Sequence, residues 1–187
     1  MSVSAQLAHI RRAKGMTAAA LACRIGTHAS NIYAIETGRR DPRSSTTGAA
    51  AHALGARVLV IDTQGRASAR DIAESILLSE NSTVRIQALV QLVANLQASD
   101  LLAKAALTID PPPAISVEWD AAIAGTVEIE LARAGLRTPA WAERATGNPV
   151  GRWDPWTAGR LAPDAEDVPE PLRRRGIWIT ADELASA

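Results

Sequence analysis

Apolar residues recur at helical spacing near the start of the chain. Leu21 and Ile25 mark the inner face of one short helix, and Ile32 and Ile35 mark the inner face of a second. Between the two pairs lies Gly26, which can adopt the left-handed backbone conformation that ends a helix. The pattern predicts two helices joined by a tight turn, with the outer side of the second helix exposed.

The same periodicity continues on both sides of this helix pair. Val3, Leu7 and Ile10 predict a preceding helix, and Thr17 is placed to cap the helix that follows it. Beyond the pair, the basic turn RRDPR leads into a further helix that ends at Gly55. We therefore expect four short helices in this part of the chain.

Polar residues next to these helices each have two interpretations. Arg11, Arg12 and Lys14 lie near the end of the first helix, where they either stabilise the helix dipole or contact phosphate. The N-cap of the second helix of the pair is either Thr27 or His28.

A short β-prone run, RVLVID at residues 57–62, follows the fourth helix. A single strand needs a partner for its edge, either in this chain or in a second copy. Pairing between two copies would give a symmetric dimer. Beyond this run, apolar stripes predict three helices between residues 68 and 109, with a break at 79–82 and a cap at Ser99 or Asp100. Such stripes indicate a core or a dimer contact.

The chain changes character after three prolines at residues 111–113, which end the helical middle. Trp119, Ile123 and Val127 recur every four residues and predict a long helix to about Gly135. Asp120 and Glu128, among other acids on this helix, permit an acid-only catalytic site, but a solvated acidic face is favoured because no His or Cys accompanies them.

The last fifty residues are rich in proline and tryptophan and predict loops with little regular structure. Residues 176–179, GIWI, read as a strand, and Thr180 with Glu183 predicts a capping box for a short final helix. Trp and Arg are enriched at binding hot spots. We expect the partner-binding residues to be Trp141, Trp153, Trp156, Arg173, Arg174, Arg175 and Trp178.

Charge is distributed unevenly along the chain. The 187 residues carry no net formal charge, but residues 1–62 hold eight basic and three acidic side chains, and the remainder is correspondingly acidic. Opposite charge on the two parts is typical of a DNA-binding head joined to a body that binds something else. The single cysteine, Cys23, excludes an internal disulfide and is expected to be a small buried side chain.

Several function classes lack their motifs. All three histidines, His9, His28 and His52, lie in the first 62 residues, and no glycine-rich phosphate-binding motif is present. We therefore expect no enzyme activity, no metal and no cofactor. No apolar run approaches the ~20 residues that span a bilayer, and the start has no signal-peptide core, so we expect a cytoplasmic protein without membrane contact.

Residues 7–62 resemble the Xre/Cro-like family of helix-turn-helix DNA-binding domains. The match lies in LxxIRRAKGMT, in IGTHASNIYAIETGRRDP and, most specifically, in the pattern IxxIExGRxxP that begins at Ile32. The chain departs from the family at Ala18, where a phosphate-fixing Gln is usual. The resemblance implies a lambda-repressor-like bundle in which Ala29, Ser30, Asn31 and Tyr33 contact DNA. The full set expected to bind DNA is Thr17, His28, Ala29, Ser30, Asn31, Tyr33, Arg39, Arg40 and Arg43.

The whole chain, with its WDPW and RRGIWI tail motifs, resembles actinobacterial antitoxin-repressors paired with nucleotidyltransferase-like toxins. The expected fold is mostly α: a helix-turn-helix domain at 1–62, a helical dimerisation or connector region at 63–110 and a loop-rich partner- or effector-binding region at 111–187. The resemblance implies an autoregulating repressor that binds an inverted-repeat operator as a homodimer and binds a cognate toxin. The alternative is a stand-alone Xre-type regulator with a small-molecule-sensing body.

Overall fold

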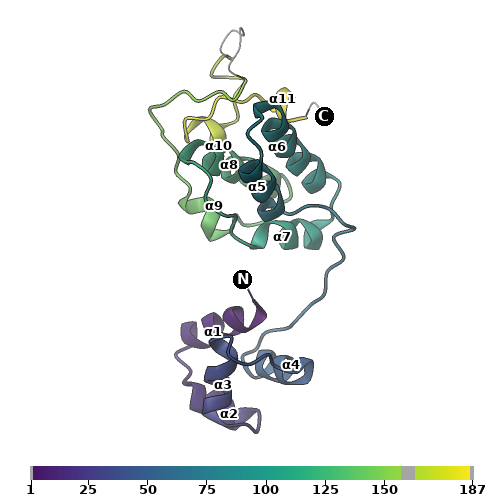
Figure 1. Cartoon of the computed structure of the whole chain (residues 1–187), viewed down its shortest axis with the longest axis vertical. Helices are drawn as coiled ribbons and strands as arrows, with labels where there is room; N and C mark the ends of the chain where they lie inside the picture. The colour runs from purple at the N-terminus through teal and green to yellow at the C-terminus, as the bar shows by residue number, and fades with distance from the viewer. Residues whose placement is uncertain (1, 157–162, 186–187) are drawn as a thin grey trace. The chain divides into compact units, whose positions relative to one another are not determined.

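The computed structural model describes residues 2–156 and 163–185 and divides into two compact units, residues 1–60 and 61–187 (Figure 1). Each unit has its own buried core, and no buried residue is shared between them. The described residues are mostly helical and contain no sheet. No helix in this part of the chain is both long and apolar enough to span a membrane.

The first unit consists of the four helices that the sequence predicts: α1 (Val3–Ala13), α2 (Ala18–Arg24), α3 (Ala29–Glu36) and α4 (Ser44–Ala53). The hydroxyl of Thr17 accepts a hydrogen bond from the amide of Ala20 at 3.1 Å and caps α2 as expected. Leu21 and Ile32 are buried in the core together with Leu54. The apolar faces of four short helices therefore meet at one centre.

Cys23 does not have the position that its sequence context predicts. The side chain is exposed, because the inward face of α2 is formed by Ala18, Leu21 and Ala22 instead. Cys23 is one residue beyond that face, which corresponds to a rotation of about 100° around the helix axis.

The β-prone run at 57–62 has no strand partner in the described chain and is assigned no regular structure. Its apolar residues Val58, Leu59 and Val60 are all exposed. A strand needs a neighbouring backbone to satisfy its amide and carbonyl groups, and the single chain supplies none here.

The described residues of the second unit form four longer helices and three short ones. The longer helices are α5 (Ala69–Leu78), α6 (Ser82–Gln97), α7 (Leu101–Ile109) and α8 (Val117–Arg133), as the apolar stripes predict. The short ones are α9 (Ala140–Arg144), α10 (Glu170–Arg173) and α11 (Ala181–Ala185). α8 packs against α5, α6, α7, α9 and α10, and residues 121–127 along it are all buried. α8 is therefore the central helix of this unit.

The helical middle and the C-terminal region form one unit, although the sequence analysis divides them at residue 110. Leu107 from α7, Trp119 from α8 and Leu172 from α10 all belong to the same buried core. The prolines at 111–113 follow the end of α7 but do not mark a domain boundary, because the next helix, α8, packs against α5, α6 and α7.

The loop-rich tail is held by backbone contacts instead of the strand expected at 176–179. Trp153 and Ile177 form one isolated parallel bridge, in which the amide of Trp178 donates to the carbonyl of Trp153 at 2.8 Å. Gly176 has a φ of +75°, and a side chain there would overlap the carbonyl of Asn148. The final helix begins with the predicted capping box between Thr180 and Glu183.

Candidate nucleic-acid interface

The turn between α2 and α3 is closed by backbone hydrogen bonds. Gly26 has a φ of +68°, and the amide of Thr27 donates to the carbonyl of Ala22 at 2.9 Å. His28 is the N-cap residue of α3, but its side chain makes no capping hydrogen bond. The sequence left Thr27 and His28 as alternatives, and the structure assigns the cap position to His28. The N-terminus of α3 therefore has no side-chain cap, and a helix N-terminus of this kind can bind an anion.

α3 is held by one face and exposes the other. Ile32 and Ile35 are buried in the core of the first unit. Ser30 and Tyr33 are exposed on the outer side, whereas Ala29 is partly buried. Small and hydrogen-bonding side chains on a protruding helix are suited to base edges in a major groove.

Asn31 is fixed from two sides. Its amide nitrogen Nδ2 donates to Thr27 Oγ1 at 3.0 Å, and its oxygen Oδ1 accepts a short hydrogen bond from Arg40 Nη1. Thr27 belongs to the turn before α3 and Arg40 to the loop after it. The carboxamide of Asn31 is therefore already oriented in the free protein.

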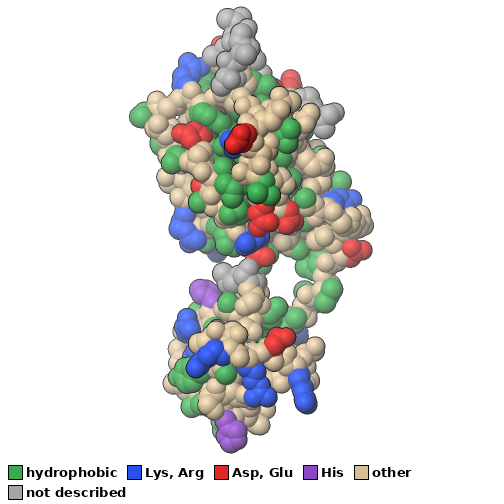
Figure 2. Space-filling model, in the orientation of Figure 1, with side chains coloured by type: hydrophobic (Ala, Val, Ile, Leu, Met, Phe, Trp, Pro, Cys, Tyr) green, Lys and Arg blue, Asp and Glu red, His purple; other side chains and the backbone are tan. Residues whose placement is uncertain are grey.

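The loop between α3 and α4 carries the basic residues. Thr37 Oγ1 donates to the carbonyl of Tyr33 at 2.7 Å and accepts from Arg39 Nε at 3.0 Å. Arg39, Arg40 and Arg43 are all exposed, and Arg43 is the N-cap residue of α4. Basic side chains gather on the face of the first unit that Figure 2 shows. Guanidinium groups beside a recognition helix are suited to phosphate contacts.

A buried ion pair positions α3 against α1. Arg11 Nε and Nη2 donate to the two carboxylate oxygens of Glu36 at 2.6 and 2.7 Å, and Nη1 donates to the carbonyl of Met16 at 2.6 Å. The hydrogen bonds to Glu36 raise the pKa of Arg11 above its usual value. Arg11 is therefore buried in an ion pair and is not available for the phosphate contact that the sequence left open for it. The Glu in the IxxIExGRxxP pattern was the available signal for this partner.

Two tryptophans of the expected partner-binding set are anchored inside the second unit. Trp141 Nε1 donates to the carbonyl of Thr108 at 2.8 Å. The ring of Trp153 meets that of Trp119 edge to face, with centroids 5.0 Å apart. Both side chains are partly buried against the core of this unit. Their indole rings therefore order the tail within the chain itself.

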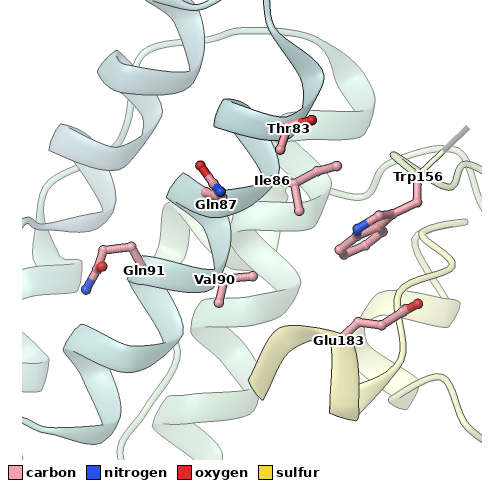
Figure 3. A pocket seen from close by; sticks show the side chains of 7 residues that line it. All are labelled: Thr83, Ile86, Gln87, Val90, Gln91, Trp156 and Glu183. Atoms are coloured by element: carbon pink, nitrogen blue, oxygen red, sulfur yellow. The ribbon is translucent and has the colours of Figure 1, made fainter. Parts of the chain in front are cut away.

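The other two tryptophans of the set are also partly buried against this core. Arg152 stacks its guanidinium on the ring of Trp178 at 3.6 Å from the centroid. Trp156 lines a hollow of about 560 Å³ opposite Ile86 and Val90 of α6 (Figure 3). Thr83, Gln87, Gln91 and Glu183 complete its lining.

The three consecutive arginines of the tail have different surroundings. Arg175 is 3% exposed, pairs with Glu128 at 2.8 Å, and donates to the backbone carbonyls of Ala142, Ala145 and Pro171. Arg174 also pairs with Glu128, whereas Arg173 is exposed and donates to the carbonyl of Ala165 at 2.7 Å. Arg175 thus holds the fold of the tail, and Arg173 presents charge at the surface.

Three of the four acidic residues of α8 have partners within the chain. Glu128 receives the two arginines, and Asp120 Oδ1 accepts the backbone amide of Ile115 at 2.9 Å. Glu130, which is buried, pairs with Arg133 at 2.6 Å. The expected solvated acidic face is therefore a set of structural contacts. No group of three or more potential metal ligands occurs among the described residues.

Comparison with known proteins identifies the first unit. Residues 2–61 match the family model of a helix-turn-helix domain. No curated protein and no solved structure matches the chain. The match covers α1 to α4 and the whole set of residues expected to bind DNA. The chain therefore carries an N-terminal helix-turn-helix head, the module of a DNA-binding regulator.

Proposed function

We propose that this protein is a sequence-specific transcriptional repressor of the Xre type and the autoregulating antitoxin of a toxin-antitoxin pair. The observation that carries the DNA-binding part is the pre-oriented carboxamide of Asn31, a partly buried residue of α3 that is held by Thr27 and Arg40. An Asn carboxamide can donate to and accept from the edge of adenine at once. Orienting it before binding removes part of the entropy cost of recognition.

The remaining residues of the head divide into two roles. Ser30 and Tyr33, exposed beside Asn31, are placed for base edges and sugar contacts. Arg39 and Arg43, in the loop after α3 and at the start of α4, are placed for phosphates. Two heads on a two-fold axis would read the halves of an inverted repeat.

The test of this function is binding of the full chain to the DNA upstream of its own gene, measured by fluorescence anisotropy over a salt series. If about six phosphates are neutralised, affinity should fall roughly 10³-fold between 50 and 200 mM salt. Arg39→Ala should weaken binding, while Arg144→Ala, an exposed arginine of the second unit, should not. Affinity that is independent of salt, or equal for operator and unrelated DNA, would contradict the proposal.

The antitoxin part rests on the second unit. Its exposed Arg173 and the stacked pair of Arg152 and Trp178 provide basic and aromatic groups of the kind enriched at protein interfaces. We expect the product of the adjacent reading frame to bind the full chain in a pull-down. Arg152→Glu with Arg173→Glu should release that product without changing operator affinity. If the charge-reversed chain still retains the product, this surface is not the site that binds it.

A second candidate function is a stand-alone regulator whose body senses a small molecule. The hollow between α6 and Trp156, at about 560 Å³, is within the usual size range of ligand pockets and favours this candidate (Figure 3). A ligand that raises the Tm of the second unit and changes operator affinity, with no bound protein, would favour the sensor over the antitoxin. Val90→Trp, which fills the hollow, should abolish both effects.

A further inference from the structure

α7 is apolar on two opposite sides. Ala103 and Leu107 face the core of the second unit, whereas Leu101, Leu102 and Ile109 are 55%, 60% and 57% exposed. A helix that is hydrophobic all round is normally covered on every side. No other described element of the second unit covers the outer side of α7.

The outer residues form a compact stripe with a small residue at its centre. At about 100° per residue, positions 101, 105, 109 and 102 lie within roughly 100° of one another around the helix. Ala105, which is exposed, is four residues from Leu101 and four from Ile109. The stripe is therefore symmetric about Ala105, with a bulky residue on each side of a small one.

A hollow lies next to one end of this stripe. It measures about 210 Å³ and lies beside Ala105 and Ile109. The loop after α8 contributes Leu136 and Pro139 to its lining, which is mainly apolar, and Arg137 lies at the same place. The opposite end of α7 carries the two exposed leucines and Asp100.

We propose that the outer stripe of α7 is the homodimer interface, paired antiparallel with the same helix of a second copy about a two-fold axis at Ala105. This axis places the partner's Leu101 against Ile109, beside the hollow, and places Leu101 against the partner's Ile109. It also brings Arg137 toward the partner's Asp100, so that opposite charges meet at both ends. The small Ala105 lets the two helices approach closely at the axis.

We infer that a second copy of the chain covers the outer stripe of α7, because the exposed leucines and the hollow lie on one face of one molecule. A two-fold interface is isologous, so each patch must complement itself. The stripe has exposed leucines at one end and a hollow at the other, and an antiparallel two-fold axis superposes these ends. This proposal rests on the proposed function in one respect: it identifies the contact that would form the homodimeric repressor. It does not require that the head bind DNA.

The first test is the oligomeric state of the full chain by sedimentation velocity. The unaltered protein should be a dimer at micromolar concentration. Leu101→Glu and Ile109→Glu, at exposed positions, should each raise the dimer dissociation constant at least about 30-fold, the loss expected at an interface hot spot. The control is Leu78→Glu at an 86% exposed position on α5, which should leave the dimer intact. Unchanged circular dichroism would show that the variants fold.

The second test is a symmetric disulfide at the proposed axis. In a Cys23→Ser background, Ala105→Cys should give a covalent dimer on oxidation, and Val150→Cys, at a 95% exposed loop position, should not. Val58→Cys tests the alternative contact through residues 57–62. The proposal is overturned if the protein is a monomer, if both α7 variants stay dimeric, or if Val58→Cys crosslinks and Ala105→Cys does not.

These outcomes are separate from those of the DNA-binding test. A dimer that dissociates in the α7 variants but never binds its upstream DNA would support the interface and refute the repressor function. A protein that binds its operator with high affinity as a monomer would support the repressor function and refute the interface.

Discussion

Arg11 and Glu36 form a bidentate ion pair that joins α1 to the end of the recognition helix α3, with both side chains less than 10% exposed. The pair determines how α3 is presented, because Glu36 is the last residue of that helix. The orientation of the residues that we propose to contact DNA therefore depends on a contact that is itself buried.

Breaking this pair should destabilise the head. Arg11→Met leaves a buried carboxylate without its partner, and removing one member of a buried pair costs about 3–5 kcal/mol. Arg11→Met with Glu36→Leu should recover most of the loss, since no unpaired charge remains. Hydrogen exchange of α1 and α3 measures the effect directly. Equal protection in Arg11→Met and in the unaltered protein would contradict the prediction.

The stabilisation from Arg11 should not change across neutral pH. Its pKa is raised in the folded head, chiefly by the hydrogen bonds to Glu36, so the contribution of its charge is complete below the unfolded value and is lost only as pH rises through the folded one. Both values lie in the strongly alkaline range. The difference in unfolding free energy between the unaltered protein and the double variant Arg11→Met with Glu36→Leu, which leaves no unpaired carboxylate, should therefore be equal at pH 7 and pH 9 to within about 0.5 kcal/mol. A smaller difference in unfolding free energy at pH 9 than at pH 7 would contradict this prediction.

Asn31→Ala should relax base preference at one operator position. Loss of a bidentate contact to adenine removes about 1–3 kcal/mol of discrimination against the other bases. The measurement is competition between operators that differ at single base pairs. Ser82→Ala, an exposed helix position of the second unit, is the control. Equal discrimination at every operator position before and after the change would exclude base reading by Asn31.

Arg40→Ala and Arg39→Ala should change DNA binding in different ways. Arg40 holds the carboxamide oxygen of Asn31, so its loss should relax the same base preference as Asn31→Ala and add little in the double variant. Arg39 donates to Thr37 within its own loop and, among the described residues, is not hydrogen-bonded to Asn31, so its loss should weaken binding to all sequences and reduce the salt slope by about one. The same operator series at two salt concentrations separates them. Additive effects of Asn31→Ala and Arg40→Ala would indicate that Arg40 acts on phosphate alone.

Gly176→Ala should destabilise the second unit far more than Gly135→Ala. Both glycines have positive φ, which costs an alanine about 1–2 kcal/mol. A Cβ at Gly176 would also overlap the backbone of Asn148, whereas one at Gly135 would meet nothing within 4 Å. All five tryptophans lie in this unit, so urea unfolding followed by Trp fluorescence reports on it alone. Equal midpoints for the two variants would show that the tail relaxes around the added methyl.

The sequence by itself determined the local structure of the head. The helix positions, the turn at Gly26 and the cap at Thr17 follow from periodicity and from local backbone chemistry, which act over three or four residues. The capping box of Thr180 and Glu183 was predictable for the same reason. The prediction of the helices between residues 68 and 109 likewise required only their apolar stripes.

Only the tertiary structure decided the contacts between distant residues. Arg11 and Glu36 are 25 positions apart, and Arg174 and Glu128 are 46 apart, so no local pattern could show that these charges pair. The burial of Arg175, the exposure of Cys23 and the single core that unites residues 69–184 have the same origin. Burial depends on which elements pack together, and that packing is a property of the whole chain, whereas helix formation depends on neighbours along it.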